Sequence, residues 1–138
     1  SREGKAAFKS LSERLEKLRD KAEQGLISSI DFIKELCQIA KDTLQAEKDL
    51  EDEQEVSPKN ALTELFLELK TDQTPALVER IVNDIDAIVR RVRFDVWQTS
   101  NAGERDVQRS LRKTLLKYQL HKDQDLFEKV YAYMKEYY

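Results

Sequence analysis

The sequence predicts an all-α fold: one compact domain of about six helices over residues 1–138. Only three Gly and two Pro interrupt the chain. Charged residues make up 37% of it, against about 25% in an average domain, and this excess is typical of long solvated helices. No stretch alternates apolar and polar residues over a strand length, and no hairpin dipeptide is present. We therefore expect no β-strand.

Two helices are expected before residue 56. Apolar residues at three- and four-residue spacing from Phe8 to Ala22 predict an amphipathic helix that ends at Gly25. A second helix begins near Ser28 or Ser29 and carries an apolar stripe from Ile30 to Leu44. It continues into the acidic residues Glu47–Glu55, whose like charges should fray most of that end.

Proline marks the next two helices. Ser57-Pro58 predicts an N-cap with proline at the first helical position, which opens a third helix containing Leu62, Leu65, Phe66 and Leu69. Thr74-Pro75 repeats this arrangement at residues 74–75 and opens a fourth helix. The apolar stripe of this fourth helix extends over residues 77–92.

The last two helices follow a break in the pattern at residues 94–100, where Trp97 is expected to anchor the loop on the core. Asn101-Ala-Gly-Glu104 has the spacing of a capping box and opens a fifth helix to about Tyr118. Asp123 is expected to cap a sixth helix that runs to the C-terminus.

Charge divides the chain into acidic helices in residues 1–56 and basic helices in residues 57–138. Residues 31–55 contain nine acids and three lysines, a balance of −6. Residues 88–122 contain nine bases and three acids, a balance of +6. The chain is therefore polarised, with an acidic first half and a basic second half.

Several classes of site are excluded by composition. Three scattered glycines cannot form a phosphate-binding P-loop. One Cys and one His are too few for a zinc site, so Cys37 is interpreted as core and His121 as a loop residue. We expect no catalytic residue, no metal and no cofactor in this segment, and no membrane span or signal peptide. The absence of an initiator Met favours an excised fragment of a larger polypeptide, although processing would leave the same mark.

The fifth helix has a basic face. On a helical wheel its five bases occupy about 140°, opposite an apolar face that should pack inward. These bases are Arg105, Arg109, Arg112, Lys113 and Lys117. Arg90, Arg91 and Arg93 would extend the surface if the fourth and fifth helices pack side by side, and Lys122 follows it. This face has two interpretations. It is a binding surface for DNA phosphates or for an acidic partner, or it has no partner and is either solvated or paired with the acidic half of the chain.

The C-terminal tail has two aromatic stripes. The stripe of Phe127, Val130, Tyr131, Met134 and Tyr138 is expected to pack in the core. Tyr133 and Tyr137 fall on another face and are expected to be an exposed pair that contacts a partner.

Residues 88–138 resemble the C-terminus of the restriction (R, motor) subunit of type I restriction–modification enzymes. The resemblance rests on residues 93–98 (Arg-Phe-x-x-Trp-Gln), on residues 102–105 (Ala-Gly-Glu-Arg) and on the closing Tyr-Tyr. At Val96 many relatives have Gly instead. The first 87 residues carry no motif that we can match.

The resemblance implies that the parent is a bacterial, cytoplasmic, ATP-dependent endonuclease and DNA translocase that uses ATP and Mg²⁺. It implies that this segment is a non-catalytic helical domain that helps to dock the motor onto the methylase and specificity subunits. Together with the charge pattern, it leads us to expect sequence-independent contacts with double-stranded DNA. The alternative is a pure protein-interaction module without DNA contact.

Overall fold

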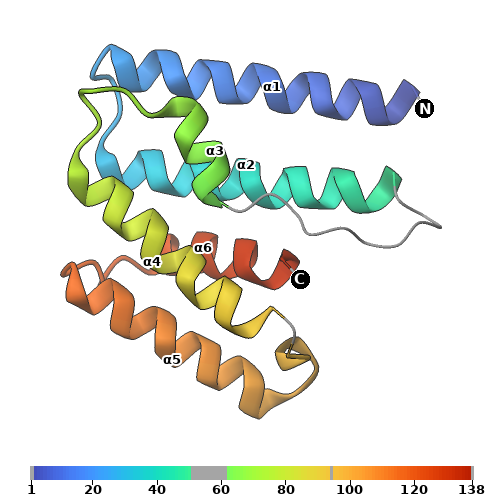
Figure 1. Cartoon of the computed structure of the whole chain (residues 1–138), viewed down its shortest axis with the longest axis vertical. Helices are drawn as coiled ribbons and strands as arrows, with labels where there is room; N and C mark the ends of the chain where they lie inside the picture. The colour runs from blue at the N-terminus through green and yellow to red at the C-terminus, as the bar shows by residue number, and fades with distance from the viewer. Residues whose placement is uncertain (1, 51–61, 94, 138) are drawn as a thin grey trace.

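The computed structural model describes residues 2–50, 62–93 and 95–137 (Figure 1). These residues form six α-helices and one short 3₁₀-helix, and no strand occurs among them, so the all-α prediction is confirmed. The elements are α1 (Arg2–Glu23), α2 (Ser29–Leu50), α3 (Leu62–Leu69), α4 (Ala76–Val92), η1 (Trp97–Thr99), α5 (Asn101–Lys117) and α6 (Gln124–Glu136). The fraying predicted after residue 50, the Ser57-Pro58 cap and Tyr138 lie outside the described residues.

The helices are arranged so that α2 and α6 are enclosed and α1 and α5 are outermost. Helix α1 packs antiparallel on α2, and α2 packs on α6 along its other side (Figure 1). Helix α4 packs against α3 and α5, and α5 lies at the edge of the molecule farthest from α1. Helix α5 therefore has the core on one side and solvent on the other.

Three predicted helix boundaries are confirmed. Gly25 has a φ of 68°, and Leu26 N donates to Lys21 O at 2.9 Å, which closes the end of α1 as a Schellman motif. Ser28 Oγ accepts from the backbone N–H of Asp31 at 3.1 Å at the start of α2. The Asp123 carboxylate accepts from Leu126 N at 2.9 Å and caps α6.

Two predicted caps are wrong. Ser100, not Asn101, caps α5, because its hydroxyl accepts from Gly103 N at 3.0 Å and Asn101 is already helical. Thr74 does not cap α4, because its hydroxyl accepts from Thr71 N at 2.9 Å and so closes the preceding turn. Pro75 occupies the N-cap position of α4 without a side-chain hydrogen bond.

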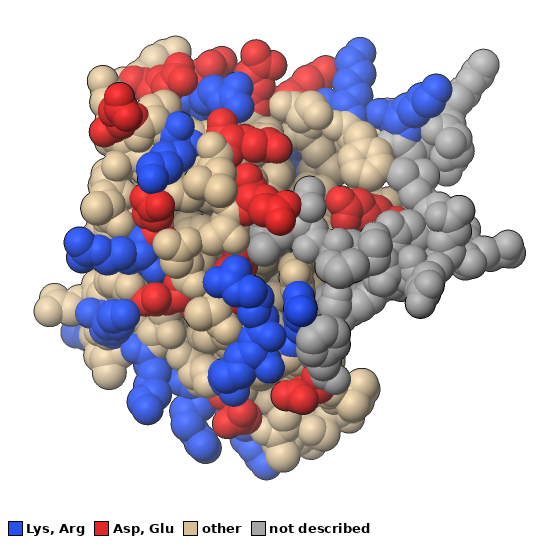
Figure 2. Space-filling view, in the orientation of Figure 1, with Lys and Arg blue, Asp and Glu red and all other residues tan. Residues whose placement is uncertain are grey.

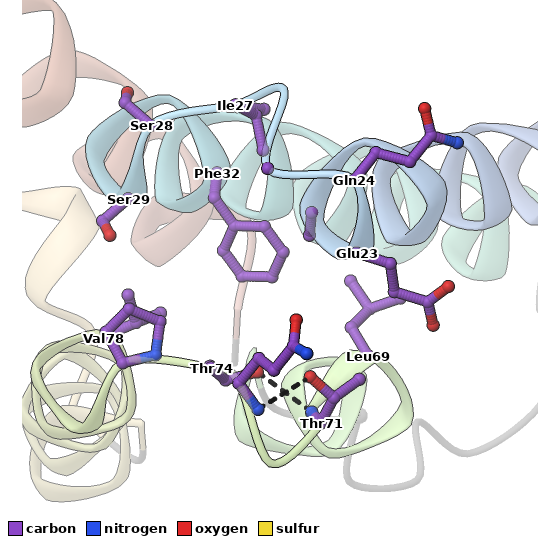
Figure 3. A pocket seen from close by; sticks show the side chains of 14 residues that line it. Glu23, Gln24, Ile27, Ser28, Ser29, Phe32, Leu69, Thr71, Thr74 and Val78 are labelled. Carbon is purple, nitrogen blue, oxygen red and sulfur yellow. Dashed lines mark hydrogen bonds between the residues drawn. The ribbon is translucent and has the colours of Figure 1, made fainter.

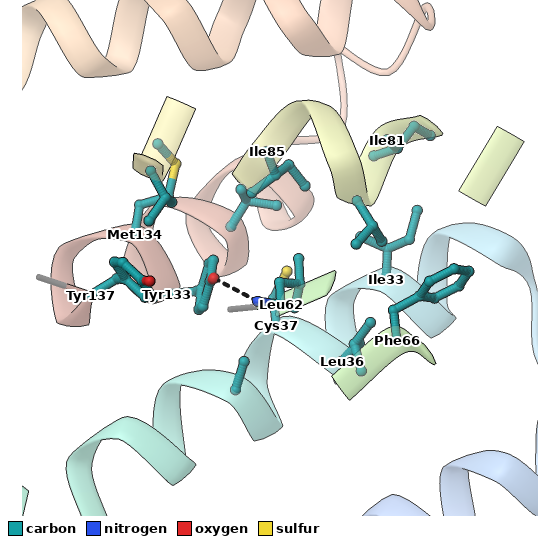
Figure 4. Packing of buried hydrophobic residues seen from close by; sticks show 14 of the residues in the cluster. Ile33, Leu36, Cys37, Leu62, Phe66, Ile81, Ile85, Tyr133, Met134 and Tyr137 are labelled. Atoms are coloured by element: carbon teal, nitrogen blue, oxygen red, sulfur yellow. Dashed lines mark hydrogen bonds between the residues drawn. The ribbon is translucent and has the colours of Figure 1, made fainter. Parts of the chain in front are cut away.

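The core is built around α2, α3, α4 and α6 (Figure 4). Cys37 and Trp97 are buried, as predicted. Leu77 was assigned to the buried stripe of α4, but its side chain is 45% exposed, because it lies about 100° around the helix from the buried Val78 and so at the edge of the stripe.

Candidate nucleic-acid interface

Helix α5 is oriented by buried residues on one side only. Val107, Leu111 and Leu115 are buried and pack toward the helices next to α5. At its N-terminus a Cβ on Gly103 would lie 2.5 Å from the carbonyl oxygen of Trp97, so only glycine allows this close approach to η1. The apolar face and this contact together turn the basic face of α5 to solvent.

Four cations form what we call the cationic face of α5: Arg105, Arg109, Arg112 and Lys113. All four are exposed, and together with Leu116 and His121 they line a shallow depression of about 480 Å³. Within residues 2–50, 62–93 and 95–137, none of the four forms an ion pair with a carboxylate. Figure 2 shows that Lys and Arg gather in the lower half of the view, where α4 and α5 lie.

The fifth predicted base of this helix behaves differently. Lys117 Nζ lies 3.0 Å from Asp84 Oδ2 of α4, and the hydroxyl of Tyr118 also donates to this carboxylate. Burial tends to raise the pKa of Asp84, but the hydrogen bonds from Tyr118 and Lys117 outweigh it and lower that pKa. The charge of Lys117 is thus compensated inside the molecule.

Helix α4 contributes one of the three arginines that were expected to extend the surface. Arg91 Nη2 donates to Ser110 Oγ of α5 at 3.0 Å, and Arg91 lines a second depression together with Lys113 and Lys117. Arg90 is exposed and Arg93 is half-buried, and neither lines this depression or that of the cationic face. The same is true of Lys122, which is exposed in the turn before α6.

The acidic half of the chain makes its ion pairs elsewhere. Asp42 of α2 lies 2.8 Å from Arg14 of α1. Helix α2 also pairs with α6, because Lys48 Nζ lies 2.9 Å from Glu136. Among the residues that the structure describes, no carboxylate of α1 or α2 forms an ion pair with a base of α5. Pairing between the two halves therefore does not account for the cationic face within this part of the chain.

The expectation of an exposed pair formed by Tyr133 and Tyr137 is wrong. Tyr133 is 0% exposed and Tyr137 is 4% exposed, and their rings contact each other with centroids 6.3 Å apart (Figure 4). The reason is that α2 and α5 both pack on α6, so the buried part of α6 is wider than a single stripe. We no longer assign these two tyrosines to a partner contact.

Tyr133 instead belongs to a buried polar network that sequence reasoning missed. Its hydroxyl donates to Asp86 Oδ1 at 2.8 Å. The same hydroxyl accepts from Leu62 N at 2.9 Å (Figure 4). Asp86 Oδ2 accepts from both the N–H and the hydroxyl of Thr63, each at 2.6 Å. Asp86 is fully buried, so its carboxylate needs these donors, which lie at the N-terminus of α3. This network holds helices together, and no ligand-binding role follows from it.

A pocket of about 470 Å³ lies at the other end of the bundle, between the α1–α2 turn and the α3–α4 turn (Figure 3). Phe32, Leu69 and Val78 form an apolar floor, and Thr71 and Thr74 hydrogen-bond to each other at its edge. Glu23 is the single ionisable residue among those that line it. This lining provides no acid–base pair and no nucleophile with an adjacent base.

The described residues contain no group of three or more His, Cys, Asp and Glu side chains suited to a metal ion. None of the described helices is long and apolar enough to cross a membrane. No family model, curated protein sequence or solved structure matches this chain. The resemblance over residues 88–138 therefore stays a prediction.

Proposed function

We propose that this chain is the non-catalytic, helical C-terminal domain of the R subunit of a bacterial, cytoplasmic type I restriction–modification enzyme. In this proposal it helps to dock the motor onto the methylase and specificity subunits, and α5 contacts the DNA backbone without reading sequence. ATP and Mg²⁺ would serve the parent polypeptide and not this segment. The family assignment rests on the resemblance over residues 88–138.

The observation that carries the DNA contact is the cationic face of α5. Four exposed cations without an ion-pair partner among the described residues attract polyanions, because no internal charge compensates them. From Arg105 to Lys113 they extend over about 12 Å of helix, at about 1.5 Å per residue. DNA carries about one charge per 1.7 Å of its axis, so such a length lies beside several phosphates.

The test is charge reversal in the full chain. The variant Arg105→Glu/Arg109→Glu/Lys113→Glu should bind a short duplex more weakly than the wild type does. Each neutralised phosphate adds about 0.9 to the slope of log affinity against log salt, so the slope should fall by about 2.7 if all three bases contact phosphate.

A matched control applies the same charge change at the opposite edge of the molecule. The variant Lys5→Glu/Lys9→Glu/Lys17→Glu alters three exposed lysines of α1, the outermost helix on that side. It should leave most of the affinity and the salt slope intact. Equal loss in both variants would mean that net charge alone drives binding, and unchanged binding in the α5 variant would refute the DNA contact.

One observation favours the alternative of a pure protein-interaction module. Leu116, in the same depression as the cationic face, is 55% exposed, and an apolar side chain bordered by arginines is typical of protein interfaces. In that case Leu116→Asn should weaken co-purification with the methylase and specificity subunits. The isolated chain would then bind duplex DNA no better than the triple-Glu variant of α5 does.

A further inference from the structure

An aromatic row lies next to the cationic face of α5. Trp97 and Tyr131 have ring centroids 5.9 Å apart, and Tyr131 stacks on Phe127 at the same distance with an interplanar angle of 22°. Tyr131 is fixed in turn, because its hydroxyl donates to Glu104 of α5 at 3.0 Å. The ring of Phe127 is buried. The row therefore presents a rigid ring at its Phe127 end.

Arg112 is the member of the cationic face whose guanidinium packs over the Phe127 ring. The central carbon of its guanidinium lies 4.8 Å from the centroid of the Phe127 ring. Among the described residues, Arg105, Arg109 and Lys113 have no comparable ring contact. A cation over an aromatic face is stabilised by the ring quadrupole, and the planar guanidinium stacks while its edge remains free to donate hydrogen bonds.

We propose that Arg112, positioned by Phe127, is the principal phosphate-binding residue of the cationic face. The inference rests on the proposed DNA contact and names the residue that makes it. A free arginine loses side-chain freedom when it binds, whereas a stacked one has already lost much of that freedom. Two guanidinium donors can then engage two phosphate oxygens together, which the ammonium group of lysine cannot do.

Arg109 and Lys113 flank Arg112 on the same face, and His121 lines the same depression. A phosphate held at the edge of Arg112 would therefore lie between two further cations of α5, Arg109 and Lys113. The competing explanation is that Arg112 only covers the Phe127 ring with its side chain and takes no part in binding.

The experiment compares two substitutions that keep the charge. Arg112→Lys loses the planar group, and Arg109→Lys is the matched control on the same face. Ordering one long side chain on binding corresponds to about two- to tenfold in affinity, so Arg112→Lys, which loses the stacked planar group, should weaken duplex binding by about that factor. Arg109→Lys should change affinity by much less. Equal effects of the two substitutions would overturn the proposal.

Phe127→Leu tests the positioning role, because it keeps an apolar side chain and removes the ring. It should weaken duplex binding to the same extent as Arg112→Lys while Arg112 is still present. Circular dichroism and thermal unfolding establish that this variant is folded. If it is folded and binds like the wild type, Phe127 has no positioning role; if it does not fold, the Arg112→Lys comparison alone decides the proposal.

A second measurement separates this proposal from the DNA contact itself. The Arg112 Nε–H resonance should show a ring-current shift in the free wild-type chain, and inorganic phosphate should perturb it more than that of Arg109. If the wild type does not bind duplex DNA, the proposed DNA contact is refuted. The phosphate titration still tests whether Arg112 is the main phosphate-binding residue of the cationic face. A titration that perturbs both resonances equally, or neither, refutes the principal role of Arg112.

Discussion

The hydroxyl of Tyr133 provides the sharpest test of how this fold is held together. Tyr133→Phe keeps the ring in its fully buried position and removes one oxygen. The substitution breaks the bond to Asp86, at 2.8 Å, and leaves the buried N–H of Leu62 without its acceptor. It changes no surface charge and fills the same space.

The magnitude follows from these two losses. A buried donor left unsatisfied costs about 1–3 kcal/mol, and a hydrogen bond to a charged group contributes about 1.5–3 kcal/mol. Asp86 keeps its two bonds to Thr63, so the losses overlap, and we expect the free energy of unfolding to fall by about 3 kcal/mol. At about 4 °C per kcal/mol for a chain of this size, the melting temperature should fall by about 12 °C.

Urea denaturation followed by far-ultraviolet circular dichroism measures this change, and the m-value should stay constant. Tyr131→Phe is the matched control: the same oxygen is removed from a half-buried side chain whose partner Glu104 also has Lys135 at 3.1 Å. We expect that control to lower stability by less than about 1 kcal/mol. If the two substitutions lower stability equally, the argument from burial is refuted.

Three further predictions concern other parts of the chain. Gly103→Ala should lower the free energy of unfolding by about 2 kcal/mol, because the added Cβ would clash with the backbone of Trp97. Urea denaturation measures this change, and an unfolding midpoint equal to that of the wild type would contradict the contact. Burial raises the pKa of Cys37 from its ordinary 9.0, so the unfolded chain loses this proton first and stability should fall as the pH rises above that value. Thermal unfolding at pH 8 and pH 10 measures this, and Cys37→Ala should show a smaller fall. Asp84→Ala removes the ion-pair partner of Lys117 and leaves this lysine able to bind a DNA phosphate. The slope of log affinity against log salt should then rise by up to about 0.9, and a lower slope would contradict the compensation of Lys117 by Asp84.

Features set by neighbouring residues could be predicted from the sequence. The caps at Ser28 and Asp123 and the turn at Gly25 depend on bonds within five residues, so the local sequence specifies them. Ser100 and Asn101 are both chemically suitable caps. The choice between them depends on where Gly103 packs against Trp97, which an isolated spacing does not reveal.

Features set by distant residues could not be predicted. Periodicity placed the exposed bases of α5 correctly, because an apolar face on one side of a helix fixes the opposite side. It could not show that Lys117 is compensated by a carboxylate 33 residues earlier. The burial of Tyr133 likewise depends on a partner, Asp86, that lies 47 residues away and on another helix.

The network around Asp86 also has a consequence for the order of folding. Helix α3 has eight residues within the described part of the chain, and isolated helices shorter than about 12 residues are marginal in water. The N–H groups of Leu62 and Thr63 are satisfied by Tyr133 of α6 and Asp86 of α4, so α3 gains these bonds only after those two helices have come together. Substitutions within α3 should then accelerate unfolding and leave the folding rate nearly unchanged. The shortest of the described α-helices would be the last to form and the first to be lost.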